Sequence, residues 1–71
     1  MSTTTLKKIG KAIKEVRLRK GLTQVDVAQK AGISTNYYAV IERGEANNIT
    51  INKLEDILKV LGVKSSDIIP F

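Results

Sequence analysis

The chain has 71 residues, no cysteine, no histidine and a formal net charge of +5 at pH 7. This length provides one small domain with a single core, and the composition excludes disulfides, thiolate chemistry, the usual zinc ligand sets and the most common acid-base catalyst. No apolar run reaches the roughly 18 residues that span a bilayer, and no apolar signal segment begins the chain. We therefore expect a cytoplasmic protein with no membrane partner.

The positive charge is concentrated at the N-terminal end. Residues 1–20 carry seven lysines and arginines against one acid, whereas residues 21–71 carry five against six. A polyanion such as nucleic acid is the natural partner of so basic a surface. Alternatively, the lysines only keep the outer face of a helix in solution, and the charge count alone is compatible with both readings.

The first predicted element is a helix that ends at Gly21. Thr4 or Thr5 is expected to cap it. Its apolar residues recur at intervals of three and four and predict one buried stripe, made of Leu6, Ile9, Ile13 and Val16. Gly10 is unusual inside a helix, where glycine costs about 1 kcal/mol relative to alanine. We interpret it as a place where another helix packs closely.

Two short helices joined by a tight turn at Gly32 are predicted next. Thr23 followed three residues later by Asp26 is a variant of the N-capping box, which predicts a helix over residues 24–30. Ser34 can cap a second helix over residues 35–43, and Gly44 can end it in the left-handed conformation. The core residues expected from this stretch are Leu22, Val27, Ala28, Ala31, Ile33, Tyr38 and Ile41.

The rest of the chain predicts one more full helix and a short last one. Residues 45–50 are polar and predict a loop, after which Thr50 can cap a helix that Gly62 ends. Ser65 can start a short fifth element that Pro70 stops. The predicted fold class is all-α: a compact five-helix bundle with a short last helix, in which residues 1–71 form one domain around a central helix-turn-helix at residues 23–43.

The central stretch resembles a known family. The run L-T-Q-x-x-V-A-x-K-A-G-I-S-x-x-Y, followed by I-E-R-G, is similar to the helix-turn-helix of the Cro and phage-repressor proteins, which restriction-modification controllers and many small bacterial regulators share. Alanine at position 28, glycine at 32, an aliphatic residue at 33 and the Glu-Arg-Gly ending carry the match. The resemblance covers nearly the whole chain and implies a lambda-repressor-like fold that binds double-stranded DNA.

In this family the second helix of the pair lies in the major groove, where its first turns face the base edges. The corresponding residues here are Thr35, Asn36, Ala39 and Val40. Asparagine can pair with adenine, and alanine or valine methyl groups can contact the thymine methyl, so we expect A·T-containing sites. Alternatively, the threonine and the asparagine serve local backbone hydrogen bonds, and the valine is ordinary surface.

Phosphate contacts would position the domain without reading sequence. The resemblance implies one at Gln24, where the amides at the start of a helix also favour an anion. Further candidates are Arg43, Asn47, Asn48 and Thr50, with Lys14 and Lys20 less certain. Tyr37 either gives its hydroxyl to a phosphate or packs across its helix.

Two further groups of residues are assigned to structure and assembly. Arg17 and Glu42 occupy the places where the family commonly has an ion pair between the first and third helices. A homodimer is expected because one helix touches few base pairs, and two copies about one helical turn apart, roughly 34 Å, would read a partly palindromic operator. We assign the dimer interface to five apolar residues: Ile49, Ile51, Val60, Ile69 and Phe71. Alternatively, these residues complete the core of one copy or lie scattered on its surface.

The sequence thus predicts a sequence-specific transcriptional regulator, either a repressor or a controller protein, that binds DNA as a homodimer. The alternative is an antitoxin-like module that neutralises a protein and binds DNA only to regulate itself. The acids are scattered, no nucleophile system is present, and so short a chain leaves little room for a substrate pocket. We therefore expect neither an enzyme nor a cofactor or metal.

Overall fold

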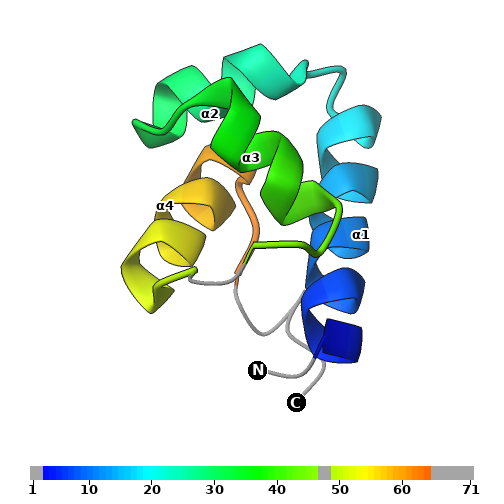
Figure 1. The fold of residues 1–71 in the computed structure, drawn as a ribbon. Coiled ribbons are helices and arrows are strands. Elements are labelled where there is room, and N and C mark those ends of the chain that lie inside the picture. The colour runs from blue at the N-terminus through cyan, green and yellow to red at the C-terminus, as the bar shows by residue number, and fades with distance from the viewer. Residues whose placement is uncertain (1–2, 47–48, 65–71) are drawn as a thin grey trace.

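The computed structural model describes residues 3–46 and 49–64, and every regular element in these two ranges is a helix. Four helices follow one another: α1 (Thr3–Arg19), α2 (Gln24–Ala31), α3 (Thr35–Glu42) and α4 (Ile51–Leu61). α2 and α3 form the helix-turn-helix; α3 packs on α1, and α2 packs on α4 (Figure 1). Within the same ranges, no helix combines the length and the apolar character needed to cross a membrane.

The predicted capping residues start three of the helices. The Asp26 amide donates to the Thr23 hydroxyl at 3.0 Å, and the Thr23 amide donates to the Asp26 carboxylate at 2.9 Å, so the capping box of α2 is complete. The hydroxyls of Ser34 and Thr50 accept from the third backbone amide of α3 and of α4, at 3.0 and 3.1 Å. Each cap satisfies an amide that the helix itself leaves unpaired.

Some helix boundaries differ from the expectation. α1 already begins at Thr3, so neither Thr4 nor Thr5 caps it; both lie within its first turn. α3 ends at Glu42, one residue early, because Arg43 is its C-cap and Gly44 takes the left-handed conformation at φ 73°. Shifts of one or two residues are usual where helix ends fray. The expected fifth helix falls in residues 65–71, outside the described residues, and the described part contains four helices.

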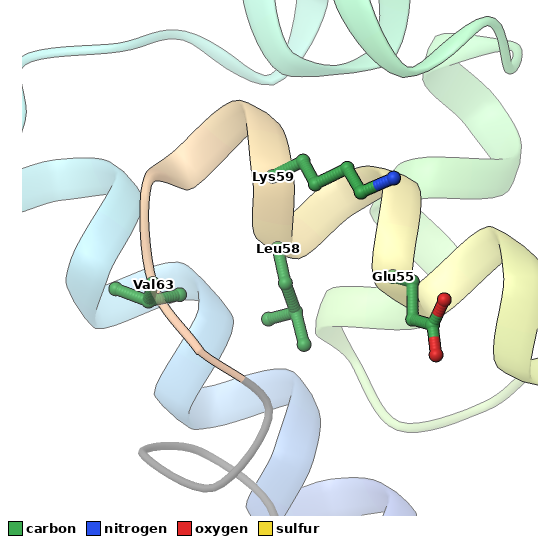
Figure 2. A pocket seen from close by; sticks show the side chains of 4 residues that line it. All are labelled: Glu55, Leu58, Lys59 and Val63. Atoms are coloured by element: carbon green, nitrogen blue, oxygen red, sulfur yellow. The ribbon is translucent and has the colours of Figure 1, made fainter.

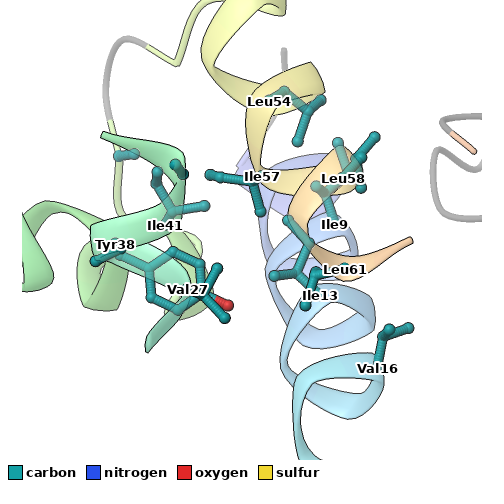
Figure 3. Close-up of a cluster of buried hydrophobic side chains, with 13 residues drawn as sticks. Ile9, Ile13, Val16, Val27, Tyr38, Ile41, Leu54, Ile57, Leu58 and Leu61 are labelled. Atoms are coloured by element: carbon teal, nitrogen blue, oxygen red, sulfur yellow. The ribbon is translucent and has the colours of Figure 1, made fainter. Parts of the chain in front are cut away.

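All four helices contribute to one apolar core (Figure 3). Tyr38 extends from α3 into its centre and is completely buried, as expected. Leu6, Leu22 and Ile33 are only half-buried, and Ala46 joins the core although the sequence did not suggest it. The buried apolar residues are Ile9, Ile13, Val16, Val27, Ala28, Ala31, Tyr38, Ile41, Ala46, Leu54, Ile57, Leu58 and Leu61.

Two glycines bring α1 directly against the end of α3. A Cβ atom on Gly10 would lie 2.5 Å from the carbonyl oxygens of Ile41 and Glu42. A Cβ atom on Gly44 would lie 2.6 Å from the Cα atom of Lys7. These distances are too short for any real Cβ atom, so the backbones themselves are in contact. The close helix packing inferred from Gly10 is confirmed, and it fixes how α3 is presented.

Candidate nucleic-acid interface

The four residues expected to read bases lie on one side of α3, because Ala39 is four positions after Thr35 and three after Asn36, and Val40 is four positions after Asn36. Asn36 is exposed, whereas Thr35 and Ala39 are half-buried. Val40 is also half-buried and packs against the core. Asn36 is therefore the most accessible hydrogen-bonding group on this face, and Val40 offers only part of its side chain to a ligand.

The start of α3 is organised without using these polar side chains. The Ser34 hydroxyl accepts the Tyr37 amide at 3.0 Å and so caps the helix. Within the described residues, the side chains of Thr35 and Asn36 make no hydrogen bond. Their alternative assignment to local backbone bonding has no support here, and both groups remain available to an external partner.

Gln24 lies at the start of α2, but its side chain turns inward. Its Nε2 atom donates to Glu42 Oε1 at 3.0 Å, and the residue is half-buried. The side-chain oxygen and the second N–H are not used by this bond. A phosphate at this end of α2 would meet a glutamine whose position is already fixed by α3.

Glu42 is the centre of a polar cluster that joins three segments. Its carboxylate accepts Arg17 Nε at 2.7 Å and Arg17 Nη2 at 3.2 Å, and the two side chains are only 9% (Arg17) and 3% (Glu42) exposed. Arg17 Nη1 also donates to the Leu22 carbonyl at 2.9 Å, which ties the turn before α2 to the same pair. The residues expected to form a structural ion pair are thus in bidentate contact.

The protonation of this cluster follows from its surroundings. Burial alone raises the pKa of the Glu42 carboxyl, but the hydrogen bonds from Arg17 and Gln24 favour the charged form and bring the pKa below its ordinary value. The hydrogen bond with Glu42 likewise raises the pKa of Arg17. The pair is therefore charged at neutral pH.

The Tyr38 hydroxyl is a buried polar group next to this pair. It lies close enough to the Glu42 carboxylate and to Arg17 for both groups to shift its pKa, yet it makes no hydrogen bond of ordinary length and angle in the described structure. Burial raises the pKa of the phenol far above its usual 10.0. The tyrosine is thus held in its neutral form, and its oxygen is an exception among buried polar atoms.

The candidates for phosphate contact after α3 have local partners. Arg43 Nε lies 2.9 Å from Glu45 Oε1 in an exposed ion pair, which makes the net charge of the two residues zero. The Thr50 hydroxyl caps α4, although the residue is exposed. Tyr37 is half-buried and packs against the core. Asn47 and Asn48 lie outside the described residues.

The residues assigned to a dimer interface differ in exposure. Ile51 is 57% exposed. Ile49 and Val60 are half-buried and pack against the core, which agrees with the alternative that they complete it. Ile69 and Phe71 lie outside the described residues.

An open hollow of about 160 Å³ lies beside the C-terminal half of α4 and the segment that follows it (Figure 2). Its lining combines two apolar residues, one acid and one base: Leu58, Val63, Glu55 and Lys59. No group of three or more histidines, cysteines or acids that could hold a metal occurs in residues 3–46 and 49–64. The hollow has no converging polar groups and lies apart from α3.

Sequence reasoning missed the partners of several candidate residues. The hydrogen bond between Gln24 and Glu42 joins residues 18 positions apart, and no local pattern reveals such a contact. The packing of Lys7 on Gly44 is also non-local. Only the pair of Arg43 and Glu45 had a local signal, namely opposite charges two positions apart just after a helix end.

Residues 13–68 match the helix-turn-helix family HTH_3, and the chain belongs to this family. The immunity repressor of Bacillus phage phi105 is 39% identical over 61 residues, which are 86% of this chain and 42% of that protein. The transcriptional regulator SinR of Bacillus subtilis is 40% identical over 55 residues, 78% of this chain and 50% of SinR. The chain thus spans about half the length of these two relatives.

Solved structures show the same fold. The wild-type restriction-modification controller protein C.Esp1396I is 41% identical, with a TM-score of 0.81 over 90% of this chain and 83% of that chain. The controller C.AhdI from Aeromonas hydrophila is 26% identical, with a TM-score of 0.86 over 92% of this chain and 97% of that chain. C.Esp1396I has also been solved as a tetramer in complex with its natural 35 base-pair operator. The expected resemblance to this family is confirmed.

Proposed function

We propose that this protein is a sequence-specific DNA-binding transcriptional regulator, and that residues 1–71 act as one DNA-binding domain. Membership of the helix-turn-helix family supports this proposal, as does the similarity to repressors and to a controller that binds operator DNA. The observation that carries it is the outer face of α3, where Thr35 and Asn36 have no hydrogen bond within the described residues. The names of the relatives favour a regulator over an antitoxin-like module.

In the proposed complex, α3 lies in the major groove and reads bases through Thr35, Asn36, Ala39 and Val40. The Asn36 amide is suited to adenine, and the Ala39 and Val40 methyl groups to thymine. No lysine or arginine lies within α3, so the most common guanine contact is absent from it. An operator with A·T pairs at the contacted positions is expected.

Phosphate contacts on both sides of the groove would hold α3 in place. We assign them to Gln24 at the start of α2 and to residues at or after the end of α3, together with the Tyr37 hydroxyl. The residues after α3 are Arg43, Asn47, Asn48 and Thr50. Because Arg43 is paired with Glu45 in the free protein, binding to a phosphate would exchange one exposed ionic partner for another at small cost.

We further propose that two copies bind a partly palindromic operator. One α3 contacts too few base pairs to discriminate well, and a two-fold axis places two such helices one DNA turn apart. The exposed Ile51 supports an interface that includes the start of α4, and Ile49, Val60, Ile69 and Phe71 are its other proposed members. We assign the protein to the cytoplasm, without an enzymatic activity.

Selection of bound duplexes from a random pool, at two salt concentrations, tests this function. We expect two half-sites about one helical turn apart, with A·T pairs in each. The variant Asn36→Ala should lose preference at one position of each half-site, while Asn52→Ala, an exposed asparagine on α4, should select the same sequences as the original protein. A pool without sequence preference, or one with only G·C pairs at the half-sites, would contradict the proposal.

A further inference from the structure

The edge of α1 that lies beside α3 carries more positive charge than the helix-turn-helix itself. Two residues of α1 that touch α3 are Gly10, through the carbonyls of Ile41 and Glu42, and Arg17, through the Glu42 carboxylate. Lys7 precedes Gly10 by three residues, and Lys14 precedes Arg17 by three. Residues three apart lie on the same side of a helix, so the two lysines belong to the edge that borders α3.

A direct contact places the first of these lysines at the end of α3. The Cα and Cγ atoms of Lys7 would lie 2.6 and 2.7 Å from a Cβ atom on Gly44, the residue that follows Arg43. The Lys7 backbone is therefore packed on the turn that we assign to phosphate contact. Lys7 and Lys14 are both exposed, and neither forms an ion pair within the described residues.

At the C-terminal end of α3, the proposed interface lacks a positive charge for a DNA phosphate. α3 contains no lysine or arginine, and the charge of Arg43 is balanced by Glu45 at 2.9 Å. A phosphate strand that passes the end of α3 would meet no net positive charge from the helix-turn-helix there. The two lysines on α1 are the neighbouring source of such charge.

We propose that Lys7 and Lys14 form a second phosphate-binding row on α1, outside the helix-turn-helix, which holds the DNA strand that passes the end of α3. This inference rests on the proposed function; it adds Lys7 to the interface and joins it to Lys14, which the sequence suggested only as a less certain phosphate contact. The contact of Gly10 and Gly44 with their neighbours serves the row, because a bulkier residue at either position would move α1 away from α3.

The matched control lies on the same helix. Lys8 and Arg19 are also exposed and basic, but the 100° step between helical residues places them away from the edge that borders α3. The double variants K7A/K14A and K8A/R19A therefore remove the same charge from two different sides of α1. Both keep every buried residue, and equal melting temperatures would show that both fold.

The test is the salt dependence of binding, measured on a selected duplex and on a duplex of unrelated sequence. For K7A/K14A we expect the slope of log affinity against log salt to flatten by roughly 1.8 for each protomer, because each lost phosphate contact contributes about 0.9. Base preference should not change. K8A/R19A should keep a slope near that of the original protein.

Equal slopes for the two double variants would overturn the inference, because they would reduce it to a general effect of net charge. A change of base preference in K7A/K14A would also overturn it, since phosphate contacts do not read sequence. Failure of the proposed function looks different: the unmodified protein would then bind both duplexes equally well. The slopes of K7A/K14A and K8A/R19A can still be compared in that case, because they are also measured on the duplex of unrelated sequence.

Discussion

Tyr38 is a completely buried residue whose hydroxyl lacks a partner in the described structure. The substitution Tyr38→Phe keeps the ring in the core and removes only that oxygen. Because an unsatisfied buried polar group is unfavourable by about 1 to 3 kcal/mol, we expect the variant to be as stable as the original protein, or more stable by up to about that amount. Urea denaturation at pH 7 measures the difference, and a clear loss of stability would show that the hydroxyl forms a bond in solution.

The same residue predicts a dependence on alkaline pH. Burial raises the folded-state pKa of Tyr38 above the ordinary 10.0, so only the unfolded chain releases this proton near pH 10. The neutral phenol of Tyr38 therefore contributes its full share to the free energy of unfolding below pH 10. This contribution is lost as the pH rises above 10, by up to about 1.4 kcal/mol per pH unit. The stability of the original protein should therefore fall faster than that of Tyr38→Phe between pH 10 and 11, and parallel curves would contradict the buried phenol.

Two glutamates pair with arginines in very different surroundings. Glu42 is 3% exposed in its pair with Arg17, whereas Glu45 is 61% exposed in its pair with Arg43. Glu42→Ala leaves a buried arginine uncompensated and should lower the unfolding free energy by about 3 to 5 kcal/mol. Glu45→Ala should change it by about 1 kcal/mol or less. Chemical denaturation of both variants checks this prediction. Equal effects would show that burial does not determine how much each ion pair contributes to the free energy of unfolding.

For single residues, the sequence predicted which side chains are exposed and which are buried more reliably than it predicted their hydrogen-bond and ion-pair partners. The pair of Arg17 and Glu42 came from the family resemblance and not from the residues themselves. The hydrogen bond from Gln24 to Glu42 was not foreseen, because it depends on the angle between α2 and α3. Asn36 is exposed as a base-reading residue must be, but Val40 is partly covered.

Among the helices, α1 shows how packing can reverse a local preference. An alanine is favoured over glycine in a helix by about 1 kcal/mol, but a Cβ atom at position 10 would lie 2.5 Å from two carbonyl oxygens of α3. Backbone atoms cannot move aside without shifting the whole helix. We therefore expect Gly10→Ala to destabilise the protein by about 1 to 3 kcal/mol, as overpacked cores do.

The control for Gly10→Ala is Thr4→Ala, an exposed position in the same helix where the gain in propensity acts alone. Thermal unfolding should show a lower midpoint for Gly10→Ala and an unchanged or slightly higher one for Thr4→Ala. A midpoint that rises in both variants would mean that α1 and α3 are not in direct contact.

Helices as units were well predicted because their signals are local. The caps Thr23, Ser34 and Thr50 act on amides three residues away, so spacing alone identifies them. The start of α1 was placed too late, since Thr4 and Thr5 are equally acceptable within a first turn. The contact between α1 and the turn after α3 was only hinted at by Gly10, because such contacts join residues more than 30 positions apart.

For the whole molecule, the family resemblance and the core pattern predicted the all-α fold of the described residues. The assembly of two copies does not follow from that fold alone. Ile51 and Leu18 are equally exposed apolar residues, each at 57%, but only Ile51 was assigned to the dimer interface. They therefore form a matched pair for testing where copies associate.

We expect Ile51→Ser to weaken self-association because it removes apolar surface that a partner would bury, an effect of about 1.5 to 3 kcal/mol for a fully buried side chain. Leu18→Ser should leave association unchanged. Sedimentation equilibrium measures both, and binding to a single half-site should remain intact in Ile51→Ser while binding to the full operator weakens. If Leu18→Ser produces monomers and Ile51→Ser does not, the interface includes α1 instead, and the two copies of α3 would then require a different spacing of half-sites.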